Sequence, residues 1–118
     1  MTVPPAQEKT HNYDFQIAHD QRIRVQIYVR NHETFRFAVS LEVLCQPGDW
    51  RRAVCIDNWG GRTHRDRYHP NGQDVAHHEP CFDSQDVNAA AKWAQQDLTQ
   101  NADAYVTYFR ALPGSECS

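Results

Sequence analysis

Residues 22–43 read RIRVQIYVRNHETFRFAVSLEV, and this stretch carries the clearest structural signal in the chain. In both of its halves apolar residues occupy every second position, with polar or charged residues between them. A period of two is typical of a strand that buries one face. The polar residues 31–33 separate the halves as a turn, so we predict two antiparallel strands that share an apolar face.

The flanking segments extend this pair in both directions. Residues 13–18 form a short candidate strand, and residues 50–57 form another after the turn residues Pro47, Gly48 and Asp49. Residues 67–69 are a candidate edge strand. Residues 1–11 are polar and contain two prolines, so we expect a flexible N-terminal arm there and a C-terminal tail at residues 113–118.

The C-terminal third carries a helical pattern. Its apolar residues recur at spacings of three and four, which is typical of an amphipathic helix: Val87, Ala90, Ala91, Ala94, Leu98, Ala102, Tyr105 and Phe109. Asp83 or Ser84 is expected to cap its N-terminus, and Asn101 is a weak point at which it can break. We therefore predict one α+β domain over residues 12–112, with an antiparallel β-meander of three to five strands packed on a C-terminal amphipathic helix.

The totals limit the class of protein. A chain of 118 residues is one domain, and it has no apolar run long enough to cross a bilayer. The N-terminus lacks the basic and apolar regions of a signal peptide, so we expect a cytoplasmic protein with no membrane partner. Its four cysteines are then expected to be thiols, with Cys45 and Cys55 as the pair that a hairpin could bring together.

Charge is distributed unevenly along the chain. Residues 21–67 carry nine arginines against five acidic residues, a net charge of +4, and the remainder carries −7. Arginine suits bidentate contacts with phosphate or carboxylate. This asymmetry favours a phosphate-rich ligand or self-complementary surfaces that form a homodimer.

Residues 55–72, CIDNWGGRTHRDRYHPNG, hold the densest set of chemically active side chains. Metal-independent RNA cleavage needs a base for the 2′-hydroxyl, an acid for the leaving oxygen and cations for the phosphate. Histidine suits the proton transfers and arginine suits the charge. The catalytic residues predicted on this basis are His64, His69, Arg65, Tyr68 and Asp57. A structural alternative stays open, in which the histidines cap turns and the aspartate binds loop amides.

The same segment resembles small α+β toxins of the TumE type, from toxin–antitoxin pairs, and related domains of unknown function. The matching positions are Asp57, Gly61, His64, Arg65, Asp66 and Tyr68, followed by an acidic-capped helix that begins near residues 82–84. Gly60 stands where the family usually has a histidine, so one functional group of the pattern is missing. The resemblance implies RNA as the target and a cognate toxin or antitoxin as a protein partner, and it leaves open which of the two this chain is.

Metal chemistry is a further alternative. His64, His69, Asp57, Asp66 or the pair at residues 77 and 78 could supply ligands, but their spacing matches no recognised metal motif. Adjacent histidines on an extended chain point to opposite sides, which makes a shared ion unfavourable. The sequence therefore predicts no metal site and no other cofactor.

A non-catalytic binding module is the remaining hypothesis. In this case an open, arginine-rich sheet face would grip RNA or an acidic protein, with Tyr28 available for base stacking. The binding residues predicted are Arg22, Arg24, Arg30, Arg36, Arg51, Arg67 and Trp59. The structural alternative is a solvated face whose arginines pair with acidic residues.

Overall fold

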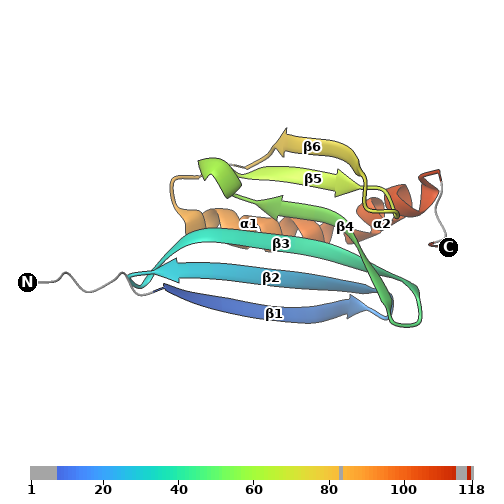
Figure 1. The fold of residues 1–118 in the computed structure, drawn as a ribbon, viewed down its shortest axis with the longest axis horizontal. Helices are drawn as coiled ribbons and strands as arrows, with labels where there is room; N and C mark the ends of the chain where they lie inside the picture. Colours follow the sequence, from blue (N-terminus) through green and yellow to red (C-terminus); the bar gives the residue numbers. More distant parts are fainter. Residues whose placement is uncertain (1–7, 83, 114–116, 118) are drawn as a thin grey trace, which may run out of the picture.

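In residues 8–82, 84–113 and 117, which the computed structural model describes, six antiparallel strands lie side by side in chain order. Two helices follow them and cover one face of the sheet (Figure 1). This two-layer arrangement is the predicted α+β meander with C-terminal helical packing. The elements are β1 (Glu8–Ala18), β2 (Gln21–Arg30), β3 (Glu33–Gln46), β4 (Asp49–Asp57), β5 (His64–Tyr68), β6 (Asp74–Pro80), α1 (Val87–Gln100) and α2 (Ala102–Ala111).

The apolar residues of the two alternating runs form the core. Val25 of β2 pairs with Val39 of β3, which in turn pairs with Ile56 of β4, and all three side chains are buried. Directly opposed residues share one face of a sheet, so this row marks the face that the helices cover. Leu98 of α1 and Phe109 of α2 complete the core from the helical layer.

The helical pattern breaks at Asn101, as predicted, and gives α1 and α2. The N-cap of α1 is Asp86, whose carboxylate accepts hydrogen bonds from the backbone N–H groups of residues 88 and 89. Ser84 instead accepts a hydrogen bond from the N–H of Asp86, and the alternative cap, Asp83, lies outside the described residues. Neither described helix combines the length and the apolar character needed to cross a membrane.

The sheet is larger than the predicted three to five strands. Strand β1 begins at Glu8, within the range expected to be a flexible arm. Its residues pair along the whole of β2, from Glu8 opposite Arg30 to Ala18 opposite Gln21. Strand β5 covers residues 64–68 and lies inside the sheet, while β6 forms the edge. The pairing of β6 with β5 is irregular, so the sequence of β6 does not show the regular alternation that is typical of a strand.

The cysteine pairing differs from the expectation. Cys45 forms a disulfide with Cys117, which ties the C-terminal tail to the end of β3. Cys55 lies opposite Ser40, five residues before Cys45 on β3, so the register keeps Cys45 and Cys55 apart. Cys55 and Cys81 remain thiols.

Candidate functional site

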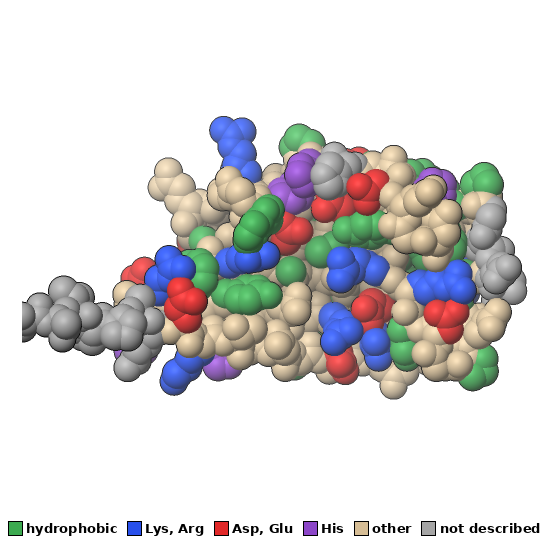
Figure 2. Space-filling view, viewed as in Figure 1, with side chains coloured by type: hydrophobic (Ala, Val, Ile, Leu, Met, Phe, Trp, Pro, Cys, Tyr) green, Lys and Arg blue, Asp and Glu red, His purple; other side chains and the backbone are tan. Residues whose placement is uncertain are grey.

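The sheet face opposite the helices carries most of the candidate functional side chains. Figure 2 shows arginine and acidic side chains across this face, with histidine beside acidic residues toward β5 and β6. Because opposed residues share a face, the register defines cross-strand rows here. Neighbouring rows are Arg24–Ser40–Cys55–Asp66 and Gln26–Ala38–Asp57–His64.

A β-bulge in β6 brings His78 to this face. Arg65 pairs with Glu79 and Arg67 pairs with Ala76, so residues 77 and 78 both lie opposite Asp66. His78 has a positive φ of 53°, which is uncommon for a residue other than glycine. The carboxylate of Asp66 accepts a hydrogen bond from the backbone N–H of His78 and thereby holds the bulge.

The bulge places two imidazoles beside a carboxylate. The rings of His64 and His78 have centroids 4.2 Å apart. One potential ligand atom from each of His64, Asp66 and His78 lies within 4.8 Å of the other two. His64 and Asp66 are buried, whereas His78 is exposed, so the cluster opens to solvent on the side of β6.

Asp57 positions His64. Its Oδ1 lies 3.0 Å from Nε2 of His64, and Nδ1 of the same ring lies 3.1 Å from the carbonyl oxygen of Arg62. The Asp57 carboxylate also accepts a hydrogen bond of 2.9 Å from the N–H of Trp59. Asp57 therefore does both things that the sequence analysis considered: it contacts the histidine and it binds a loop amide.

Trp59 stands next to this cluster in a firmly anchored turn. The side chain of Asn58 hydrogen-bonds the backbone of β3 at Phe35 and Phe37, and Gly60 adopts a φ of 79° that favours glycine. The guanidinium of Arg36 lies 3.6 Å from the ring centroid of Trp59. Although this contact fixes the indole, 60% of the Trp59 surface stays exposed.

A pocket of about 430 Å³ lies between this turn and the histidines. Such a volume is within the usual range for small-molecule sites. We call it the Trp59 pocket. Its lining residues are Trp59, Gly60, Arg62, Thr63, His64, His78 and Pro80.

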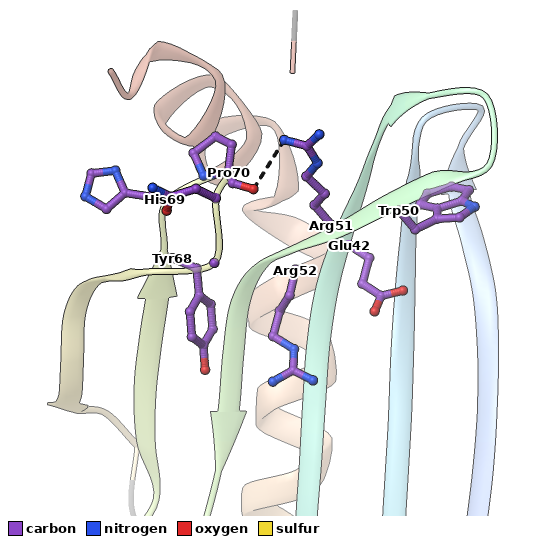
Figure 3. Close-up of a pocket in the computed structure, with 9 residues that line it drawn as sticks. Glu42, Trp50, Arg51, Arg52, Tyr68, His69 and Pro70 are labelled. Carbon is purple, nitrogen blue, oxygen red and sulfur yellow. Dashed lines mark hydrogen bonds between the residues drawn. The ribbon is translucent and has the colours of Figure 1, made fainter. Parts of the chain in front are cut away.

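Another pocket, of about 500 Å³, lies at the far end of β5 and includes the predicted residues Tyr68, His69 and Arg51 (Figure 3). The imidazole of His69 points away from Arg51, and burial raises the pKa of Tyr68, so its phenol stays protonated at neutral pH. The four residue steps of β5 separate its ends by roughly 13 Å. His64 and His69 therefore do not form one catalytic pair.

Arg65 and Arg67 lie on the helix-covered side of β5. Arg65 donates a hydrogen bond of 2.9 Å to the hydroxyl of Tyr105, and Arg67 forms an ion pair of 2.7 Å with Glu79. Successive residues of a strand point to opposite faces, so Arg65 is directed away from the pocket that His64 lines. The structure thus groups His64 with Asp57 and Trp59, and separates them from Arg65, Tyr68 and His69.

Most of the predicted binding arginines are paired with acidic residues. These ion pairs are Arg22–Glu42 at 2.6 Å, Arg24–Glu42 at 3.8 Å, Arg30–Glu8 at 2.7 Å and Arg51–Asp49 at 2.8 Å. Arg51 also lies opposite the core residue Val43, so it does not share the open face with Arg24. Arg36, like Arg22 and Arg30, lies over aromatic rings, but among the described residues no ion pair joins it to an acidic side chain.

The sequence offered residues 77 and 78 as possible metal ligands, but residues 77–79 were interpreted as a polar loop and His78 was not predicted as a site residue. The bulge that redirects His78 depends on the pairing of β5 with β6, and no local pattern encodes it. The side chain of residue 77 lies outside the described part of the chain. A weak signal was present in Asp66, which both the metal alternative and the family resemblance had singled out.

Comparison with known proteins adds a family but no activity. Residues 6–113 match the family described as Domain of unknown function (DUF7718). No curated protein and no solved structure matches the chain. Since the family match spans almost the whole chain, this protein belongs to the family Domain of unknown function (DUF7718).

Proposed function

We propose that this protein is a TumE-like toxin–antitoxin component that binds single-stranded RNA at the Trp59 pocket and cleaves it there. The observation that carries the proposal is the placement of an exposed, fixed indole beside two histidines. The resemblance of residues 57–68 to the TumE pattern supports the same target. A cytoplasmic location and a cognate partner protein belong to this proposal, although the Cys45–Cys117 disulfide is a feature that reducing compartments disfavour.

Base stacking is the first part of the argument. Arg36 lies between Tyr28 and Trp59, with its guanidinium 5.0 Å and 3.6 Å from the respective ring centroids. This stack holds the indole in one orientation without covering it. Single-stranded nucleic acids bind to exposed aromatic rings because every base has a face that can stack.

Phosphate contact is the second part. Arg62 is exposed and lines the Trp59 pocket. Among the residues that the structure describes, no ion pair joins Arg62 to an acidic side chain. Its charge is thus available to the RNA backbone, in contrast to the charges of Arg22 and Arg24.

The chemistry of cleavage is the third part. In a metal-independent reaction, an acid and a base would have to reach opposite sides of an in-line phosphate, each within hydrogen-bond distance of the group that it serves. His64 and His78, with ring centroids 4.2 Å apart, converge on one position instead. The cluster is therefore better suited to act together on one group, such as a non-bridging phosphate oxygen or an attacking water.

The alternative is a binding module without catalysis that uses the arginine-rich open face. Arg22, Arg24 and Arg36 do share that face with Tyr28, as the register requires. However, Arg22 and Arg24 converge on Glu42, which is buried between them and reduces their attraction for phosphate. The pocket therefore has the stronger case.

The test is the binding of a fluorescently labelled single-stranded RNA by the full chain and by Trp59→Ala. Loss of one stacking ring costs about 1–3 kcal/mol, so we expect affinity to fall by roughly 5- to 150-fold. Phe82→Ala is the matched control, because Phe82 is also exposed but stacks on Trp93, at a centroid distance of 5.5 Å. Equal affinity of Trp59→Ala and wild type would refute the proposal.

A further inference from the structure

We infer that His64, Asp66 and His78 bind a divalent first-row transition metal ion beside the Trp59 pocket, which His64 and His78 line. Two of these residues lie two positions apart on β5 and so point to the same face. The third comes from the bulge of β6. Their potential ligand atoms lie within 4.8 Å of one another, and small rotations of the side chains would bring them to the spacing of about 3.3 Å that ligands have around one zinc ion.

The bulge is the device that completes the set. In a regular antiparallel ladder a single residue of β6 would lie opposite Asp66, whereas here residues 77 and 78 both do. The positive φ of His78 is unfavourable for a residue with a β-carbon, and Asp66 offsets that cost by accepting the N–H of His78. Strained residues at bulges often re-aim a side chain toward a functional site.

The contacts of His64 fit the role of a ligand. The carbonyl oxygen of Arg62 can only accept, so Nδ1 of His64 carries a hydrogen and donates it. Metal-binding histidines usually donate their other ring N–H to an oxygen in this way. Nε2 lies 3.0 Å from Oδ1 of Asp57, a distance at which the two atoms share a proton, so a bound ion would take the place of that proton. The distance of 3.0 Å between these two atoms is also close to the separation of neighbouring ligands around one zinc ion, so Asp57 can serve as an additional ligand.

The donor set selects the type of ion. Imidazoles favour zinc, iron, nickel and related ions, while calcium and magnesium prefer oxygen ligands. The carboxylates of Asp57 and Asp66 together carry a charge of −2, which a divalent cation neutralises. When Asp57 does not bind the ion, the three remaining protein ligands leave a fourth coordination position open, as in catalytic rather than structural zinc sites. His78 is exposed and lines the Trp59 pocket, so the cluster is accessible from it.

A bound metal ion would occupy the position on which the rings of His64 and His78 converge. The catalytic use of the ion rests on the proposed function, in which it would polarise a phosphate oxygen or activate a water. The binding itself does not depend on RNA. It is therefore tested with the metal alone.

The experiment is calorimetric titration of the chelator-treated full chain with Zn²⁺, followed by substitution with Co²⁺ and its visible absorption spectrum. We expect one Zn²⁺ per chain and a cobalt spectrum typical of nitrogen and oxygen ligands. His78→Ala should weaken binding at least tenfold. His69→Ala, which removes a histidine from the other end of β5, should bind as the wild type does.

Two results would overturn the inference. These are the absence of Zn²⁺ binding and equal Zn²⁺ binding by His78→Ala and wild type. Circular dichroism checks the fold of each variant, and His78→Gln provides a polar replacement if the alanine variant unfolds. RNA binding by Trp59→Ala, measured in chelator, separates the two proposals: loss of RNA affinity without any Zn²⁺ binding would leave the RNA proposal standing and remove the metal.

Discussion

The carboxylate of Asp66 on β5 accepts a hydrogen bond from the backbone N–H of His78, across the bulge of β6. This contact joins the two strands at the point where the ladder is irregular. It also sets the direction of the His78 side chain, which then lies against His64. A single buried carboxylate thus shapes the strand edge and the candidate site together.

Asp66→Ala should destabilise the fold. It removes a buried acceptor and leaves the N–H of His78 without that partner, at a cost of about 1–3 kcal/mol in the free energy of unfolding. Asp66→Asn keeps an acceptor oxygen and should lose less. Urea unfolding in the presence of a chelator measures both variants without a contribution from bound metal. Equal stability of Asp66→Ala and wild type would show that the bulge does not depend on this hydrogen bond.

Arg62→Gln should change the salt dependence of RNA binding. If Arg62 contacts one phosphate of a single strand, its loss lowers the slope of log affinity against log salt by about 0.7. Arg24→Gln is the control for the open-face alternative, because Arg24 shares Glu42 with Arg22. A larger loss for Arg24→Gln than for Arg62→Gln would move the RNA site from the pocket to the open face.

The disulfide between Cys45 and Cys117 should contribute substantially to stability. Its partners are 72 residues apart in sequence, and closing a loop of that length stabilises the folded state by about 4 kcal/mol in the chain-entropy model. Cys117→Ser or a reducing agent should lower the urea midpoint, whereas Cys81→Ser should not. An unchanged midpoint after complete reduction would contradict this expectation.

Tyr105 should ionise only at very high pH. Burial, aided by a hydrogen bond of 2.6 Å to Asp97, raises its pKa from 10.0 to about 12. Because the folded-state pKa is raised, the stability linked to this group is complete below pH 10 and is lost as the pH rises through about 12. A difference titration of phenolate absorbance between wild type and Tyr105→Phe measures this. A step near pH 10 in the difference curve would disagree with the structure.

Much of the fold could be predicted because its signals are local. The alternation in residues 22–43 gave two strands and the buried face, and the helical spacing gave the packing layer and its break at Asn101. Strand β6 was missed because its irregular pairing breaks the alternation, and the Cys45–Cys117 pairing was missed because it joins residues 72 positions apart in sequence. Local pattern carries no information about such contacts.

The candidate site was predictable only in part. The density of polar side chains identified residues 55–72, and within them the structure does bring Asp57, Trp59 and His64 together. The sequence alone could not separate Arg65 from His64. The segment expected to be a loop there is strand β5, whose residues point alternately to opposite faces. His78 required the bulge.

The most direct test is the cleavage of labelled single-stranded RNA by the full chain, compared with His78→Ala and His69→Ala. The two variants differ in one respect that matters: His78 lines the Trp59 pocket, whereas His69 lines the pocket at the other end of β5. We predict that His69→Ala cleaves as the wild type does and that His78→Ala loses cleavage while remaining folded. Full cleavage by His78→Ala, or its loss in His69→Ala alone, would contradict the assignment of the site.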